Sequence, residues 1–185
     1  MRRSRLRPFV VAGIAIISTM AMSVAGVLAH DRPDHSTKPQ SGGSLVVAGN
    51  VAQKLRLSVP DLAAMPNQKT VEVTFRAGDG TEHRIFTGPL LLDVLARAAP
   101  QFDPTIKNDS LRHFVSVTAG SDGYRALVAY GELDPSFEDK QILLAVTQDG
   151  ASLAKQGPRL VVPGDIAGGR YVTGVSTVRL DKPRR

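Results

Sequence analysis

FVSVTAGSDGYRALV, residues 114–128, and GPRLVVPGD, residues 157–165, each combine a strand-like apolar run with a glycine-rich loop. In the first run, the SDG sequence at 121–123 is typical of a tight turn, because glycine tolerates a positive φ and aspartate closes an Asx turn. In the second run, Pro163 ends a buried strand by removing a ladder donor. The two runs therefore predict loops on a rigid sheet, where binding groups are usually displayed.

Upstream of these runs, the sequence predicts further strands. Residues 44–49 form an apolar run, and residues 54–59 alternate with a period of two, as a half-buried strand does. Residues 70–76 and 81–86 flank Gly-Asp-Gly at 78–80, which is a hairpin signature. These patterns predict a β-rich domain.

Short helices and one more strand complete the prediction. VPDLAAMP at 59–66 has an aspartate in its first turn and a proline at its end. Residues 90–98 place leucine, valine and alanine on one face of a helix. Residues 141–147 predict a further buried strand, followed by a turn at 148–150. The predicted fold class is α+β, with mixed β-sheets and short helices.

The N-terminus has the pattern of an export signal. Four arginines precede an apolar, uncharged core at 9–27, and VLA at 27–29 fits the small-residue cleavage rule. We expect cleavage after Ala29, which would place the protein in the periplasm or outside the cell. An uncleaved N-terminal membrane anchor is the alternative, since about 20 apolar residues can span a bilayer. Residues 30–43 are polar and predict a flexible tail, which leaves residues 44–182 as a single domain.

Charge and cysteine content exclude several classes of protein. The chain has 23 Lys and Arg against 17 Asp and Glu, but the predicted signal holds four of the arginines and no acid, so most of the excess is absent from the mature chain. No basic stripe with interleaved aromatic residues points to nucleic acid. The chain has no cysteine, so it has no disulfide, thiolate metal ligand or cysteine nucleophile. No Ser-His-Asp order predicts a catalytic triad.

Five segments in a fixed order resemble a known family. They are residues 45–51, 57–62, 87–95, 121–124 and 157–164, and together they extend over nearly the whole predicted domain. The set resembles the molybdopterin-binding domain of sulfite oxidase-like proteins. This resemblance implies a mixed α+β fold, with β-sheets and short helices around a pterin pocket.

One departure from this family bears directly on its chemistry. The family's enzymes hold molybdenum partly through a cysteine thiolate, which would fall near residues 75–77. A soft thiolate cannot be replaced by the Phe, Arg and Ala found there. The chain therefore resembles most the small, exported, cysteine-free members. For some of these, the resemblance implies binding of a reduced pterin in the periplasm, without molybdenum or catalysis, and a report to a membrane-bound cyclic-di-GMP signalling enzyme.

The candidate ligand-binding residues lie mostly in the two glycine-rich loops. A carboxylate can accept paired hydrogen bonds from the N–H edge of a pterin, an aromatic ring can stack on its face, and arginine can bind a phosphate, a carbonyl or a polar tail. Each type also has an ordinary structural role, as an Asx-turn aspartate, a core or rim tyrosine, or an arginine in a surface ion pair. The predicted set is Arg76, Ser121, Asp122, Tyr124, Arg159, Asp165, Arg170 and Tyr171.

The predicted pocket is the cleft between the loops at 121–124 and 165–171. Arg76 is included because it sits where the missing metal ligand would be and could supply a positive charge there. No catalytic and no metal-ligating residue is expected. Three functions remain open: a periplasmic pterin-binding accessory of a signalling protein, a molybdopterin-dependent oxidoreductase or its subunit, and a partner-binding structural domain without a ligand.

Overall fold

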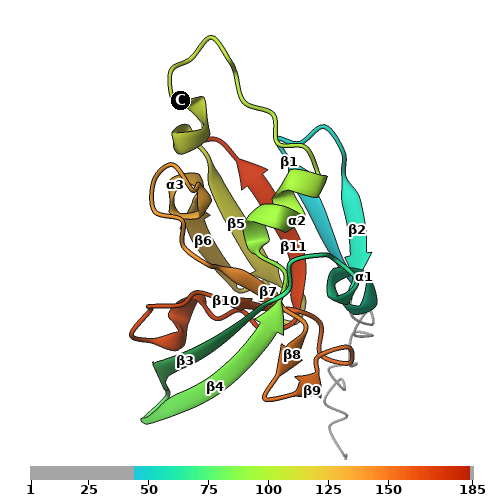
Figure 1. Ribbon diagram of the computed structural model, residues 1–185, viewed down its shortest axis with the longest axis vertical. Coiled ribbons are helices and arrows are strands. Elements are labelled where there is room, and N and C mark those ends of the chain that lie inside the picture. Colours follow the sequence, from blue (N-terminus) through green and yellow to red (C-terminus); the bar gives the residue numbers. More distant parts are fainter. Residues whose placement is uncertain (1–43, 184–185) are drawn as a thin grey trace, which may run out of the picture. The chain divides into compact units, whose positions relative to one another are not determined.

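The computed structural model describes residues 44–183, which lie in one compact unit. A five-stranded mixed sheet forms one part of this unit (Figure 1). Its strand order is β2-β1-β11-β5-β6, with β1 and β11 parallel and all other neighbours antiparallel. The strands are β1 (Ser44–Gly49), β2 (Leu55–Ser58), β5 (Phe114–Ala119), β6 (Arg125–Ala129) and β11 (Val175–Asp181).

A second, antiparallel sheet has the order β3-β4-β8-β9. A separate antiparallel pair, β10–β7, lies beside the C-terminal end of β4. The β3–β4 hairpin turns through Gly78 and Asp79, where Gly78 takes a φ of +56° that favours glycine. The strands are β3 (Lys69–Ala77), β4 (Gly80–Gly88), β7 (Leu143–Ala145), β8 (Thr147–Gln148), β9 (Ala151–Ser152) and β10 (Arg159–Val161).

Short helices connect the strands. The first, α1 (Val59–Ala63), starts at a capping box in which Ser58 Oγ accepts a hydrogen bond from Asp61 N at 3.2 Å, and Ser58 N donates to the Asp61 carboxylate at 2.8 Å. The longer α2 (Leu91–Arg97) buries its apolar face in the main core. The remaining helical elements are α3 (Tyr130–Leu133) and the 3-10 turns η1 (Asp109–Arg112) and η2 (Gly168–Arg170).

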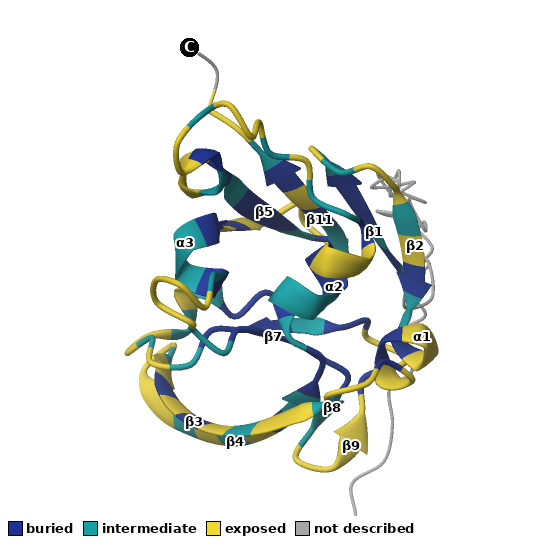
Figure 2. Cartoon of the chain, turned by 45° about the horizontal axis from the view of Figure 1, so that its top comes forward, coloured by how far each residue is buried: buried dark blue, intermediate teal, exposed yellow. Residues whose placement is uncertain are grey.

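The buried side chains form two clusters. The larger one lies between the five-stranded sheet and the helices α1 and α2, and along β6 its members alternate with exposed positions (Figure 2). The smaller one lies under the β3–β4 hairpin and includes Phe75, Phe86, Val161 and Tyr171. The pocket described below opens beside this smaller cluster.

The structure confirms the α+β class that the sequence predicts. The strand at 44–49, the hairpin around 78–80 and the helix within 90–98 occur where the patterns place them. The single strand predicted over 141–147 is wrong, because the chain leaves β7 at Ala145 and enters a different sheet as β8. The predicted signal and tail, 1–29 and 30–43, lie outside the described residues. Among the helices of the described residues, none is both long and apolar enough to cross a membrane.

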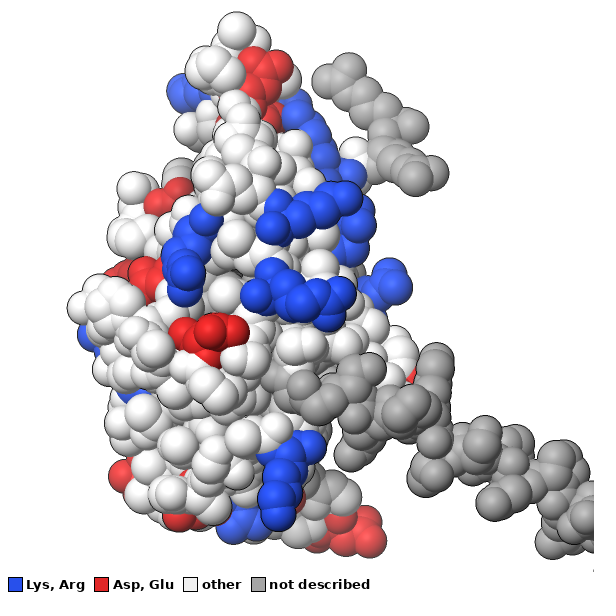
Figure 3. Space-filling view, turned by 90° about the vertical axis from the view of Figure 1, so that its right-hand side faces the viewer, with Lys and Arg blue, Asp and Glu red and all other residues white. Residues whose placement is uncertain are grey.

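The surface charges are not evenly spread over the domain. The side that carries β2 and α1 presents several Lys and Arg side chains close together (Figure 3). Arg56 is an exposed residue of β2, and it does not line the pocket described below. Arg56 therefore offers a control for testing the arginines of that pocket.

The end of β11 is tied to η1 by an ion pair that should make stability depend on pH. Lys182 Nζ donates to the Asp109 carboxylate at 2.6 Å, and this hydrogen bond lowers the pKa of the buried Asp109 carboxyl below its usual value. A carboxyl with a lowered folded-state pKa contributes stability above its unfolded-state value, about pH 4, and loses that contribution as the pH falls through the folded-state value.

We therefore expect Lys182→Met to lower the unfolding free energy at pH 7 and to differ progressively less from the wild type below about pH 4. Urea unfolding at several pH values measures this difference. The control is Lys155→Met, which removes an exposed lysine that forms no ion pair within residues 44–183. A difference between Lys182→Met and wild type that stays constant down to pH 2 would contradict the assignment.

Candidate functional site

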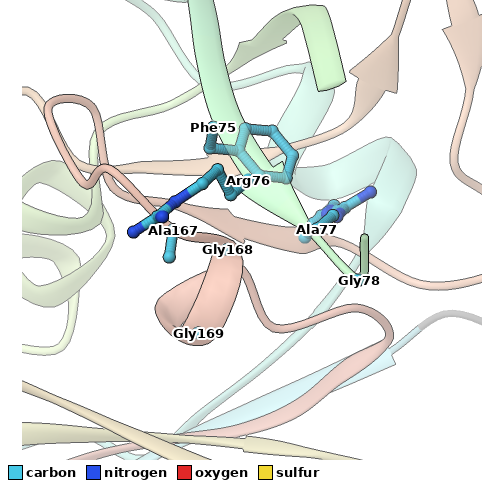
Figure 4. A pocket seen from close by; sticks show the side chains of 8 residues that line it. Phe75, Arg76, Ala77, Gly78, Ala167, Gly168 and Gly169 are labelled. Carbon is cyan, nitrogen blue, oxygen red and sulfur yellow. The ribbon is translucent and has the colours of Figure 1, made fainter. Parts of the chain in front are cut away.

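An open pocket of about 530 Å³ lies between the end of β3 and the η2 turn. Figure 4 shows the two walls: residues 75–78 on one side and Ala167, Gly168 and Gly169 on the other. Arg159, from the start of β10, completes the lining. Three segments far apart in the sequence therefore build this pocket.

Backbone pairing brings two of these segments together. Arg76 N donates to Ile166 O at 2.9 Å, and Arg76 forms a parallel bridge with Ala167. Gly168 packs so closely on the Phe75 ring that a Cβ there would lie 2.9 Å from the ring. A side chain at position 168 would therefore push η2 away from β3, and glycine allows the close approach.

The aromatic residues beside the pocket belong to the core. Phe75 and Tyr171 stack with their ring centroids 4.2 Å apart, and their exposed fractions are 2% and 6%. Tyr171 Oη donates to Val162 O at 3.1 Å. The sequence interpretation of Tyr171 as a ring that stacks on a ligand therefore needs correction, because both its ring and its hydroxyl are engaged inside the domain.

Arg159 has an unusual environment for a guanidinium. Its Nη1 donates to Gln148 Oε1 at 2.9 Å, and its guanidinium carbon lies 5.3 Å from the centre of the Phe86 ring. Its Nε is buried and has no hydrogen-bond partner among the described residues. Burial lowers the pKa of Arg159 from its ordinary value, with smaller effects from neighbouring charges. A buried donor without a partner destabilises the folded protein.

Arg76 supplies a second positive charge at the pocket. It is exposed, and within residues 44–183 its side chain makes no ion pair. Arg76 and Arg159 therefore place two guanidinium groups around one open space. Guanidinium groups bind carboxylates, phosphates and carbonyl oxygens, and their planes also stack on aromatic rings.

Arg170 and Asp165 bind each other. Arg170 Nε and Nη2 donate to the two carboxylate oxygens of Asp165 at 2.8 and 2.7 Å, and Arg170 Nη1 donates to Glu132 at 3.0 and 3.1 Å. The hydrogen bonds that Arg170 donates to Asp165 raise the pKa of Arg170. Asp165 was predicted to accept the N–H edge of a pterin, but both of its oxygens are already held by Arg170.

The loop at 121–124 supports η2 from outside. Asp122 accepts a hydrogen bond from Tyr124 N at 2.9 Å, which is the Asx turn that was the alternative interpretation of this residue. Tyr124 is half exposed, and its Oη donates to Gly169 O at 2.6 Å. Ser121 is exposed and does not line the pocket.

The pocket differs in position from the predicted cleft. Of the eight predicted residues, Arg76 and Arg159 line it, and the other six do not. The two glycine-rich loops do touch, through Tyr124 and Gly169, but the open space lies between η2 and β3. Phe75, Ala77, Gly78 and Ala167 also line the pocket and are not among the residues predicted from the sequence. Two sequence signals lie near them, the hairpin glycine at 78 and the position of the family's cysteine near residues 75–77.

A search of solved structures found a similar fold. The sulfane dehydrogenase SoxCD from Paracoccus pantotrophus superposes with a TM-score of 0.60 at 19% sequence identity. This likeness supports a coarse sulfite oxidase-like fold. The superposition covers 76% of this chain and 38% of the SoxCD chain, so the present chain spans well under half of that protein's length. No protein-family model matches the sequence, and no curated protein matches it.

The residues at the pocket do not fit a thiolate-bound molybdenum. The chain has no cysteine, and within residues 44–183 no group of three or more His, Asp or Glu residues is arranged to hold a metal ion. The pocket instead offers the exposed Arg76 and the side chain of Arg159, and guanidinium groups donate to the oxygen or nitrogen acceptors of a polar organic molecule.

Proposed function

We propose that this chain is an exported, non-catalytic protein that binds a reduced pterin in the pocket between β3 and η2. One observation carries the proposal. Residues 75–77, where the sequence resemblance expects the metal-binding cysteine, line an open pocket but contribute Phe, Arg and Ala. The pocket of this family would then bind the pterin part of the cofactor but lack the cysteine that holds the metal.

The chemistry of the two arginines suits such a ligand. A pterin offers a ring carbonyl and ring nitrogens as acceptors, and a planar face. Because the Phe75 ring is already stacked on Tyr171, the guanidinium planes of Arg76 and Arg159 are the surfaces that could stack on this face. Arg159 lines the same pocket, so its guanidinium would lie beside the bound ring.

The resemblance also motivates the partner and the location in this proposal. The protein would act in the periplasm after signal cleavage, or on an N-terminal membrane anchor, and report the pterin to a membrane-bound cyclic-di-GMP signalling enzyme. Ligand binding can be tested on the isolated protein, before any partner is known.

We expect the purified protein to release a pterin that mass spectrometry identifies, and to bind a tetrahydropterin in calorimetric titration. Arg76→Gln and Arg159→Gln should each weaken binding about ten- to a hundredfold, because a hydrogen bond from a charged donor contributes roughly 1.5–3 kcal/mol. The control Arg56→Gln removes an exposed arginine of β2 and should bind like wild type. If Arg76→Gln and Arg159→Gln both bind with wild-type affinity and melt normally, the pocket assignment is wrong.

A second function, an oxidoreductase or its subunit, is favoured by the structural likeness to a sulfane dehydrogenase. Elemental analysis separates it from the first. Stoichiometric molybdenum in the purified protein would support the oxidoreductase and contradict the proposal above. The third possibility, a partner-binding domain without a ligand, would leave the protein free of both pterin and molybdenum.

A further inference from the structure

The η2 turn forms one wall of the pocket, where Gly168 packs on the Phe75 ring and Gly169 O accepts a hydrogen bond from Tyr124 Oη. It consists of three residues, Gly168–Arg170, and none of their side chains is buried. Two of the three are glycines, which lose more conformational freedom on ordering than any other residue. The position of this wall must therefore depend on contacts outside η2.

An ion-pair cluster supplies such contacts at both ends of the loop that carries η2. Asp165 begins this loop and Arg170 ends it, and the guanidinium of Arg170 holds the carboxylate through two hydrogen bonds. The other side of the same guanidinium binds both oxygens of Glu132 in α3. The side chains of Arg170, Asp165 and Glu132 are 29%, 17% and 19% exposed, respectively, so water and salt screen their charges only in part.

Glu132 is itself firmly placed. Its carboxylate accepts a hydrogen bond from Ala129 N at 3.0 Å, and Lys140 Nζ lies 3.5 Å from it. The cluster therefore connects the pocket wall to the junction of β6 and α3, which belongs to the main core through Tyr130 and Leu133.

We infer that Asp165, Arg170 and Glu132 are positioning residues, which hold η2 in place for the ligand without touching it. The expected effect on ligand affinity rests on the proposed function. The expected effect on the conformation of η2 does not depend on any ligand. If the cluster is broken, η2 samples more conformations in the free protein, and ordering it on binding costs affinity.

The first test needs no ligand. Hydrogen exchange of the backbone amides at 166–170 should become faster in Glu132→Gln and Arg170→Gln, while exchange in β5 stays unchanged. Glu132→Asp keeps the charge and should restore part of the protection. The matched control is Glu138→Gln, which removes a more exposed carboxylate that contacts Lys140 but is not bonded to Arg170.

The second test is calorimetric titration of the same variants with a tetrahydropterin. Glu132→Gln should bind roughly three- to tenfold more weakly at a temperature where the variant is still fully folded, with Glu138→Gln like wild type. Unchanged exchange at 166–170 in Glu132→Gln and Arg170→Gln would overturn the inference, whatever the protein binds. Faster exchange in a protein that binds no pterin would support the role of the cluster in holding the wall and contradict the proposed function. Faster exchange with unchanged affinity would show that the wall does not govern binding, and would also overturn the inference.

Discussion

Tyr171→Ala should destabilise the domain by about 3–5 kcal/mol, as the loss of a large buried aromatic ring does. The Tyr171 ring is 6% exposed and stacks on Phe75, and its hydroxyl donates to Val162 O. Its removal would leave a cavity in the smaller cluster and would remove one of the two hydrogen bonds to Val162 O, which also accepts from Asp165 N. Urea unfolding at 25 °C measures the change.

Two comparisons make this expectation specific. Tyr124→Ala removes a ring that is 51% exposed and should cost much less. Tyr171→Trp adds volume to a packed site and should also destabilise, by about 1–3 kcal/mol. If Tyr171→Ala instead keeps wild-type stability and loses only ligand affinity, Tyr171 is a ligand-stacking residue, as the sequence first suggested.

Gly88→Ala should lower the unfolding free energy by about 3 kcal/mol or more, because overpacking against backbone cannot relax as it does against a flexible side chain. A Cβ at position 88 would lie 2.3 Å from Leu144 O and 2.7 Å from Ala145 Cα. This is the place where β4 meets β7, so the change would push two sheets apart. The unfolding midpoint and slope in urea measure it.

Gly169→Ala is the matched control for Gly88→Ala. A Cβ at position 169 meets no atom within 4 Å, so the same substitution should change stability by no more than about 0.5 kcal/mol. If Gly88→Ala lost as little unfolding free energy as Gly169→Ala, the contact between β4 and β7 would be looser than the structure describes.

Much of the local structure was predictable because its signals are local. The apolar run of β1 and the glycines of the β3–β4 turn each act over a few neighbouring residues. The limit of such signals appears at residues 141–147. There, one continuous apolar run is divided between β7 and β8, because Val146 N bonds to Thr87 O while the flanking residues enter different sheets.

The candidate site was only partly predictable, for a similar reason. Arg76 and Arg159 were selected as ligand-binding residues, and both line the pocket. Asp165 and Arg170 were selected as separate ligand contacts, but they bind each other. No sequence signal placed Glu132 beside Arg170, since 38 residues separate them along the chain.

The sequence by itself therefore determined the α+β class, the hairpin and turn positions, the absence of a thiolate metal ligand, and which residue types could meet a planar polar ligand. Only the tertiary structure decided where the pocket opens and which polar groups remain available in it. Hydrophobic periodicity and turn chemistry depend on near neighbours, whereas the parallel bridge between Arg76 and Ala167 joins segments that are distant in sequence. The tertiary packing also engages Asp165 and Tyr171 in contacts within the protein and leaves Arg76 and Arg159 lining the open space.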